Sequence, residues 1–200
     1  MNKNLWILLL FVFASADASL IDRGGGFIYD DILDITWTQD ANINGQDTWD
    51  NQLAWAAGLS IVDTRAGAGG ITYSDWRLPT TLQPDASCSN QSLGDSFGLG
   101  CTGSEMGHLF NVDGVSVTIP GLFTNVQSSI YWSGTESASL TFTAWFFDFD
   151  SGDQSATGKS INNYAWAVRD GDVAAVPVPA AVWLLGSALG LLGWMRRKST

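Results

Sequence analysis

Three aspartates after an aromatic segment have the chemistry of a calcium site. Asp148, Asp150 and Asp153 lie close together in the sequence, and carboxylate oxygens are the hard ligands that Ca²⁺ prefers. Two neighbours fit poorly, because Gly152 occupies a ligand position and Lys159 stands where an EF-hand-like loop has glutamate. Ca²⁺ is therefore the one cofactor candidate, with a solvated acidic turn as the alternative.

The tripeptide Gln83-Pro84-Asp85 offers a second kind of calcium chemistry. It matches the motif with which galactose-type C-type lectins coordinate calcium and sugar hydroxyls. Those lectins also carry a downstream Trp-Asn-Asp, which this sequence lacks, so a chance match is the better interpretation.

Residues suited to catalysis are scarce. His108 is the single histidine, and no nucleophile elbow lies near it, which argues against a serine-hydrolase triad. Carboxylate pairs such as Asp148 and Asp150 are unavoidable among 20 acidic residues, so they do not indicate a glycosidase. We predict that the protein is not an enzyme, and a secreted hydrolase is the weakest alternative.

Cys88 and Cys101 are the two cysteines of the chain, and they flank a loop rich in Ser, Gly and Asn. In an exported protein the simplest outcome is one disulfide. A zinc site is disfavoured, because two sulfurs and a single distant histidine do not supply a usual ligand set.

The net charge of the chain limits the kinds of molecule that it is expected to bind. The chain has 20 Asp and Glu against nine Lys and Arg, a net charge of −11. Nucleic acids and heparin-like sugars bind clustered Lys and Arg, and the exported part has no such cluster. We therefore expect no nucleic-acid partner, whereas a neutral glycan is compatible.

Local patterns predict short strands and two helices. The β-rich ranges 27–30 and 35–38 should pair as a hairpin, while 142–150 and 163–169 alternate as strands do. Helices are expected from Thr48 to about Leu59 and over 106–110, the second behind a capping box of Thr102 and Glu105. Seven tryptophans are predicted to form core: Trp37, Trp49, Trp55, Trp76, Trp132, Trp145 and Trp166.

Residues 1–18 have the pattern of a secretory signal peptide. Lys3 supplies the charge, Leu5 to Phe13 the apolar centre, and Ala14-Ser15-Ala16 a small-residue cleavage site. We therefore expect the secretion machinery to export the chain and residues 19–175 to form the mature domain.

The last 25 residues have three parts. They are the proline motif Val176-Pro177-Val178-Pro179-Ala180, an apolar run over 180–195, and the basic residues Arg196, Arg197 and Lys198. A helix over the apolar run covers roughly 24 Å, enough to enter a membrane with local thinning. The basic end is expected to stop transfer and to stay on the cytoplasmic side.

This order of parts resembles the exosortase sorting signal of Gram-negative bacteria. The resemblance implies that residues 176–200 hold the chain in the inner membrane during sorting. By the same resemblance, exosortase is expected to cut near the proline motif and to pass the domain to the cell surface or extracellular matrix. A permanent single-pass anchor is the alternative.

Ordered motifs within the exported part carry another resemblance. Asp75-Trp76-Arg77-Leu78-Pro79-Thr80, Tyr131-Trp132-Ser133-Gly134-Thr135 and Ala167-Val168-Arg169 resemble the Lcl C-terminal domain family. That family is similar to the C-type-lectin-like fold, which implies an α+β domain with a twisted antiparallel sheet, two helices and long loops. The chain departs from it at Gly134, where serine is usual, and in an insertion that carries both cysteines.

Together these features predict a non-catalytic protein of the cell surface or matrix. A lectin-like module that binds a neutral extracellular glycan is the first hypothesis. A structural coat or biofilm-matrix protein without a discrete ligand is the alternative.

Overall fold

The hairpin expected at 27–30 and 35–38 forms the centre of the first sheet. β2 (Phe27–Asp30) and β3 (Ile35–Thr38) pair antiparallel over their whole length, which confirms the prediction. β1 (Leu20–Gly24) adds to β2, and β11 (Val168–Asp170) adds to β3. The structure is a computed structural model, and it describes residues 20–173.

The aromatic segment lies in the middle of a second sheet. β9 (Thr143–Asp148) pairs antiparallel with β8 (Ile130–Glu136) on one side and with β10 (Gln154–Gly158) on the other. Side chains alternate along β9 as predicted, with Trp145 opposite in direction to Phe146. Both faces are buried, so β9 is a central strand rather than one with a solvated side.

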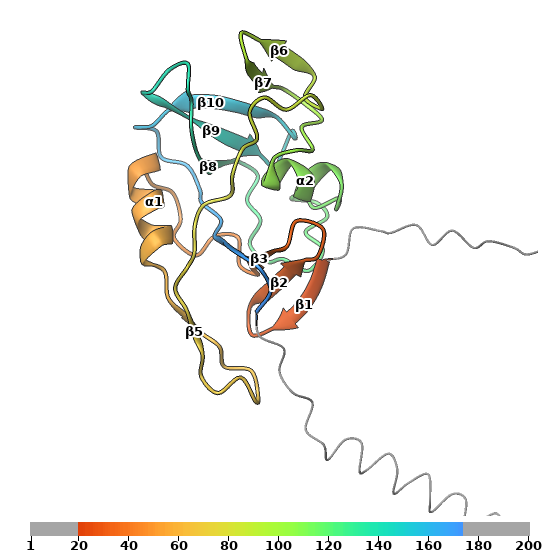
Figure 1. Ribbon diagram of the computed structural model, residues 1–200, viewed down its shortest axis with the longest axis vertical. Coiled ribbons are helices and arrows are strands. Elements are labelled where there is room, and N and C mark those ends of the chain that lie inside the picture. The colour runs from red at the N-terminus through yellow and green to blue at the C-terminus, as the bar shows by residue number, and fades with distance from the viewer. Residues whose placement is uncertain (1–19, 174–200) are drawn as a thin grey trace, which may run out of the picture.

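The remaining elements are short. α1 (Trp49–Gly58) and α2 (Glu105–Asn111) are the two predicted helices. β4 (Ile61–Val62) pairs with β5 (Thr72–Tyr73), and β6 (Asn90–Ser92) pairs with β7 (Asp95–Phe97). The described chain is a mixed α+β domain with several antiparallel sheets, where one twisted sheet was expected (Figure 1). Loops rich in Gly, Ser and Asp separate the sheets, because such residues favour turns over extension.

The predicted side-chain caps of the helices are wrong. Thr48 and Ser104 are the N-cap residues, and neither side chain bonds to the first turn of its helix. Glu105 does not reach back to Thr102, because its carboxylate accepts hydrogen bonds of 2.7 and 2.8 Å from Arg77. A tertiary ion pair therefore replaces the expected capping box.

The segment 163–170 runs between the sheets and bonds to both. Only its last three residues form a regular strand, whereas a strand from 163 was predicted. Before them, single bridges join Asn163 to Asp47 and Tyr164 to Tyr131. The side chains still alternate as in a strand, since Trp166 lies in the largest core cluster and its two neighbours lie in two smaller ones.

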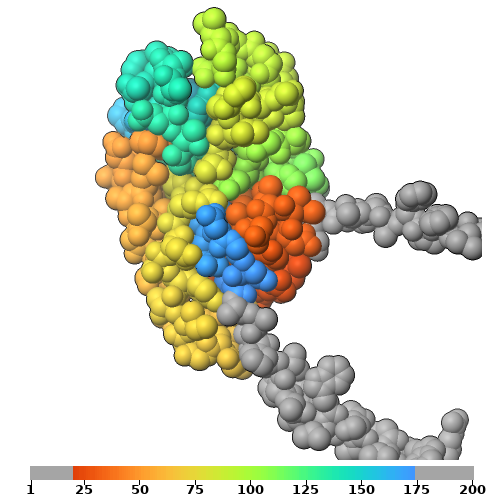
Figure 2. All heavy atoms as spheres, viewed as in Figure 1, coloured from red at the N-terminus to blue at the C-terminus, as the bar shows by residue number. Residues whose placement is uncertain are grey.

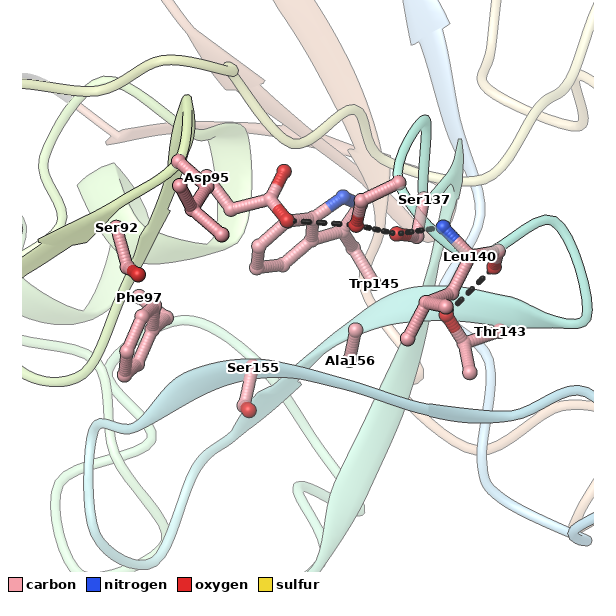
Figure 3. A pocket seen from close by; sticks show the side chains of 11 residues that line it. Ser92, Asp95, Phe97, Ser137, Leu140, Thr143, Trp145, Ser155 and Ala156 are labelled. Carbon is pink, nitrogen blue, oxygen red and sulfur yellow. Dashed lines mark hydrogen bonds between the residues drawn. The ribbon is translucent and has the colours of Figure 1, made fainter.

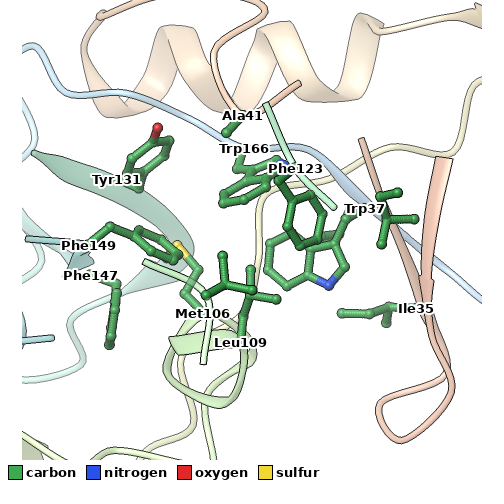
Figure 4. Packing of buried hydrophobic residues seen from close by; sticks show 13 residues of the cluster. Ile35, Trp37, Ala41, Met106, Leu109, Phe123, Tyr131, Phe147, Phe149 and Trp166 are labelled. Atoms are coloured by element: carbon green, nitrogen blue, oxygen red, sulfur yellow. The ribbon is translucent and has the colours of Figure 1, made fainter. Parts of the chain in front are cut away.

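The largest core cluster is aromatic (Figure 4). The ring centroid of Trp166 lies 5.2 Å from that of Trp37 and 4.8 Å from that of Phe123, both edge to face. Tyr131 and Phe149 join the same cluster with centroids 5.2 Å apart. Six of the seven tryptophans within residues 20–173 are buried, which confirms that they form core.

Two ion pairs lock the range 75–77 to β11. Arg77 donates to Asp170 at 2.6 Å in addition to its two bonds with Glu105. Arg169 donates to both carboxylate oxygens of Asp75 at 2.9 Å. Burial disfavours the charge of Arg77, but the hydrogen bonds to Glu105 and Asp170 outweigh it and raise the pKa of the guanidinium.

Arg77→Met should lower the free energy of unfolding by about 2–4 kcal/mol, because Glu105 loses its charged partner in a half-buried site. Arg23→Met is the matched control, since Arg23 pairs with Asp172 nearer the surface and such pairs contribute at most about 1 kcal/mol. Urea denaturation followed by tryptophan fluorescence measures both. Equal losses in the two variants would contradict the locking role of Arg77.

The predicted targeting segments lie outside the described residues. They are the signal peptide over 1–18, the proline motif over 176–180, the apolar helix over 180–195 and the basic end over 196–198. Within residues 20–173, no helix has the length and apolar character needed to cross a bilayer.

Candidate functional site

A hollow lies between the β6–β7 hairpin and the sheet of β8 to β10. The hairpin and the loop after β8 rise on either side of it in the space-filling view (Figure 2). Its volume is about 470 Å³, which is within the range of small-molecule sites. We call it the hairpin groove, and its lining comprises Ser92, Leu93, Asp95, Phe97, Ser137, Ser139, Leu140, Thr143, Trp145, Ser155 and Ala156.

Covalent and backbone bonds hold the hairpin against the sheet. Cys88 and Cys101 form the predicted disulfide near the base of the hairpin. Gly98 and Gln154 exchange backbone hydrogen bonds of 2.8 and 2.9 Å, which tie the end of β7 to the start of β10. The insertion that carries both cysteines thereby becomes one wall of the groove.

A chain of hydrogen bonds crosses the groove and fixes the opposite wall (Figure 3). Ser139 Oγ donates to Asp95 Oδ2 at 2.7 Å, and the hydroxyls of Ser137 and Ser139 lie 3.0 Å apart. Thr143 Oγ1 donates to the carbonyl of Leu140 at 2.8 Å. Asp95 therefore links the hairpin to the loop after β8 and orients the hydroxyls between them.

The groove combines apolar surface with hydroxyls. Phe97, which is half-buried, supplies aromatic surface, whereas Trp145 borders the groove but is only 3% exposed. The hydroxyls of Ser92 and Ser155 have no hydrogen-bond partner among the described residues. Asp95 is the only charged side chain in the lining. An anionic ligand would meet this carboxylate without a compensating base, so the groove suits a neutral polar ligand.

Leu93, at the tip of the hairpin, departs from two local preferences. Its φ is +52°, in the left-handed region that favours glycine and asparagine at hairpin turns. Its side chain is fully exposed. A leucine costs about 1–2 kcal/mol in this conformation, and such strain is concentrated at positions that bind.

The predicted calcium residues surround the turn between β9 and β10. Asp148 accepts hydrogen bonds from Asp150 N at 2.9 Å and from Ser151 Oγ at 2.8 Å. Burial, and then the charge of Asp148, raise the pKa of Asp153. The described part of the chain has two separate groups of three side chains whose potential metal-ligand atoms lie within 4.8 Å of one another. Neither group contains these aspartates. Calcium binding at this turn stays a prediction.

Within the tripeptide Gln83-Pro84-Asp85, the side chains of Gln83 and Asp85 form hydrogen bonds to other parts of the protein. Gln83 exchanges hydrogen bonds of 2.7 and 2.8 Å with the backbone of Ser96. Asp85 is buried and accepts hydrogen bonds from Ser87 and from Gly103 N. These bonds hold the insertion together, in agreement with the interpretation of the tripeptide as a chance match to lectins.

Sequence reasoning did not identify the hairpin groove. Its lining comes from three separate stretches, and isolated serines carry no pattern that sets them apart from loop residues. Leu93 before Gly94 was the one local signal, because a leucine at a two-residue hairpin turn is out of place.

The fold and the groove define a small α+β domain whose aromatic core supports a preformed surface site. A family model of the Lcl C-terminal domain matches residues 26–169, and the chain belongs to this family. The match includes all three motifs that carried the resemblance. No curated protein matches the chain significantly, and membership of the family fixes no specific function.

Replacing both cysteines, as Cys88→Ser with Cys101→Ser, should lower the free energy of unfolding by about 3 kcal/mol, because the unfolded chain is no longer cross-linked. Amide hydrogen exchange should rise more in β6 and β7 than in β8 and β9, since the bond holds the base of the hairpin. Reduced wild-type protein is the control and should match the double variant. Unchanged exchange in the hairpin would show that the disulfide does not anchor it.

Proposed function

We propose that the protein is a non-catalytic, lectin-like module of the cell surface or extracellular matrix, and that the hairpin groove binds a neutral glycan. The observation that carries the proposal is the composition of the groove. Half-buried aromatic surface from Phe97 and the exposed side chain of Leu93 lie beside the hydroxyls of Ser92 and Ser155, which have no partner among the described residues, and the lining has no basic residue. Sugar rings present apolar faces and hydroxyls together, so this lining offers a partner to each.

The absence of catalysis is part of the proposal. The groove lining holds one carboxylate, Asp95, whereas glycoside hydrolysis by the usual mechanisms needs two. Asp95 is also engaged with Ser139 across the groove. This arrangement favours binding over turnover, and a structural coat protein without a ligand remains the alternative that the experiment below distinguishes.

The finer fold assignment, a C-type-lectin-like domain, also belongs to the proposal. Its support is the resemblance of the family to that fold, together with two helices and long loops around antiparallel sheets. In such an arrangement the sheets are the rigid part and the loops carry the site, as the hairpin groove does.

Export and sorting by exosortase complete the proposal. The sequence patterns over 1–18 and 176–200 support it, and so does the disulfide, because disulfides persist in oxidising compartments. The intact mass of protein recovered from its host should show cleavage after the signal peptide and near Pro177 to Ala180. A reporter fused near Gly121 and found in the cytosol would overturn this part.

An array of neutral oligosaccharides, followed by calorimetry on each hit, tests glycan binding. Leu93→Gly should weaken binding about ten- to hundredfold, because burial of a leucine side chain against a ligand contributes about 1.5–3 kcal/mol. Its stability should stay within about 1 kcal/mol of wild type, since glycine relieves the left-handed backbone.

Phe142→Ala is the matched control, because Phe142 is also exposed and apolar but lies outside the groove. It should bind as wild type does. No hit on the array, with or without Ca²⁺, would favour the structural coat protein, and equal affinity of Leu93→Gly and wild type would place the ligand elsewhere.

A further inference from the structure

Three side chains far apart in the sequence meet where the first sheet contacts α2. Asp30 ends β2, His108 lies in α2, and Asp113 follows that helix. One ligand atom from each lies within 4.8 Å of the others. Figure 1 places α2 next to the turn between β2 and β3, where the three residues converge. We call this group the Asp-His-Asp cluster.

The cluster contains an unusual concentration of unsatisfied polar atoms. Eight buried side-chain nitrogen or oxygen atoms lack a hydrogen-bond partner among the described residues, and four belong to this cluster. They are Asp30 Oδ2, His108 Nε2 and both oxygens of Asp113. Because a buried polar atom without a partner costs free energy, a group that satisfies all four at once is expected here.

The cluster is also strongly buried. The Asp113 side chain is 1% exposed, as is the Asp30 residue, and the His108 side chain is 11% exposed. Two carboxylates in such a place repel each other, and burial followed by the charge of Asp30 raises the pKa of Asp113 to about 6. A cation between them would remove the repulsion and the desolvation cost together.

We propose that the Asp-His-Asp cluster binds one divalent transition-metal ion of the zinc type. The distance from His108 Nε2 to Asp113 Oδ2 is 3.9 Å, which is too long for a hydrogen bond. It suits two ligands of one ion, because ligands at about 2.0–2.2 Å from zinc lie up to about 4.4 Å apart. The imidazole favours zinc over calcium, which prefers oxygen ligands alone.

Backbone hydrogen bonds orient one of the three ligands. Asp30 Oδ1 accepts hydrogen bonds from Ile32 N at 3.0 Å and Leu33 N at 2.9 Å, which leaves Oδ2 directed to the cluster. Asp113 also borders a hollow of about 320 Å³. An ion could enter from this side and keep water as a further ligand. The site would join β2 to α2 and is separate from the hairpin groove, so neither proposal depends on the other.

Titration of the full-length purified chain with Zn²⁺ after removal of metals by EDTA tests the inference. Calorimetry should find one ion per chain, and the melting temperature should rise by about 5–10 °C at a hundredfold excess over the dissociation constant. Co²⁺ should give visible absorption bands as it binds. Asp113→Asn and His108→Gln should each weaken Zn²⁺ binding at least tenfold and abolish the Co²⁺ bands.

Asp150→Asn is the matched control, because Asp150 belongs to the acidic turn after β9 and lies outside the cluster. It should keep the full response to Zn²⁺, and Ca²⁺ should not compete with Zn²⁺ at equal concentration. If either Asp113→Asn or His108→Gln does not fold, the Zn²⁺ affinity of the other variant provides the test. No melting shift at about 100 μM Zn²⁺, far above the dissociation constants of protein zinc sites, would overturn the inference. So would an unchanged response in a folded cluster variant.

Discussion

The bonding of residues 163–170 to both sheets is the constraint on which the rest of the structure depends. Tyr164 shares backbone hydrogen bonds with β8, and Val168 shares them with Arg77 and pairs with β3. Trp166 fills the aromatic core between those contacts. The last part of the described chain therefore closes the domain onto the first hairpin, and the small sheets need this closure because none buries enough surface alone.

Polar contacts then fix the positions of those elements that the hydrophobic core does not hold. Arg77 bridges Glu105 and Asp170, so it sets where α2 begins relative to β11. The disulfide and the backbone hydrogen bonds of Gln154 fix the position of the β6–β7 hairpin, which contributes little to the hydrophobic core. The hairpin groove is thus built from loops, but each wall is held by a covalent bond or by hydrogen bonds to a central sheet.

The acidic character of the protein has two different consequences. Many carboxylates within residues 20–173 are exposed or paired with arginine, as Asp63, Asp75 and Asp172 are. Asp30 and Asp113 are buried together beside the single histidine, where solvent cannot screen them. The same composition that argues against anionic ligands at the hairpin groove therefore favours a cation at the Asp-His-Asp cluster.

The sequence by itself determined several of the local elements and the family. β-rich composition placed β2 and β3, alternation placed β9, and helical spacing placed α1. The second helix was placed by a capping box that does not form, and two cysteines in a chain expected to be exported predicted their bond. Only the tertiary structure shows that the strands are divided among several sheets, that Glu105 pairs with Arg77, and which residues line the hairpin groove. It also brought His108, dismissed as a lone imidazole, to two aspartates. Periodicity and capping act over a few neighbouring residues, whereas ion pairs, grooves and metal sites join residues whose separation in the sequence carries no signal.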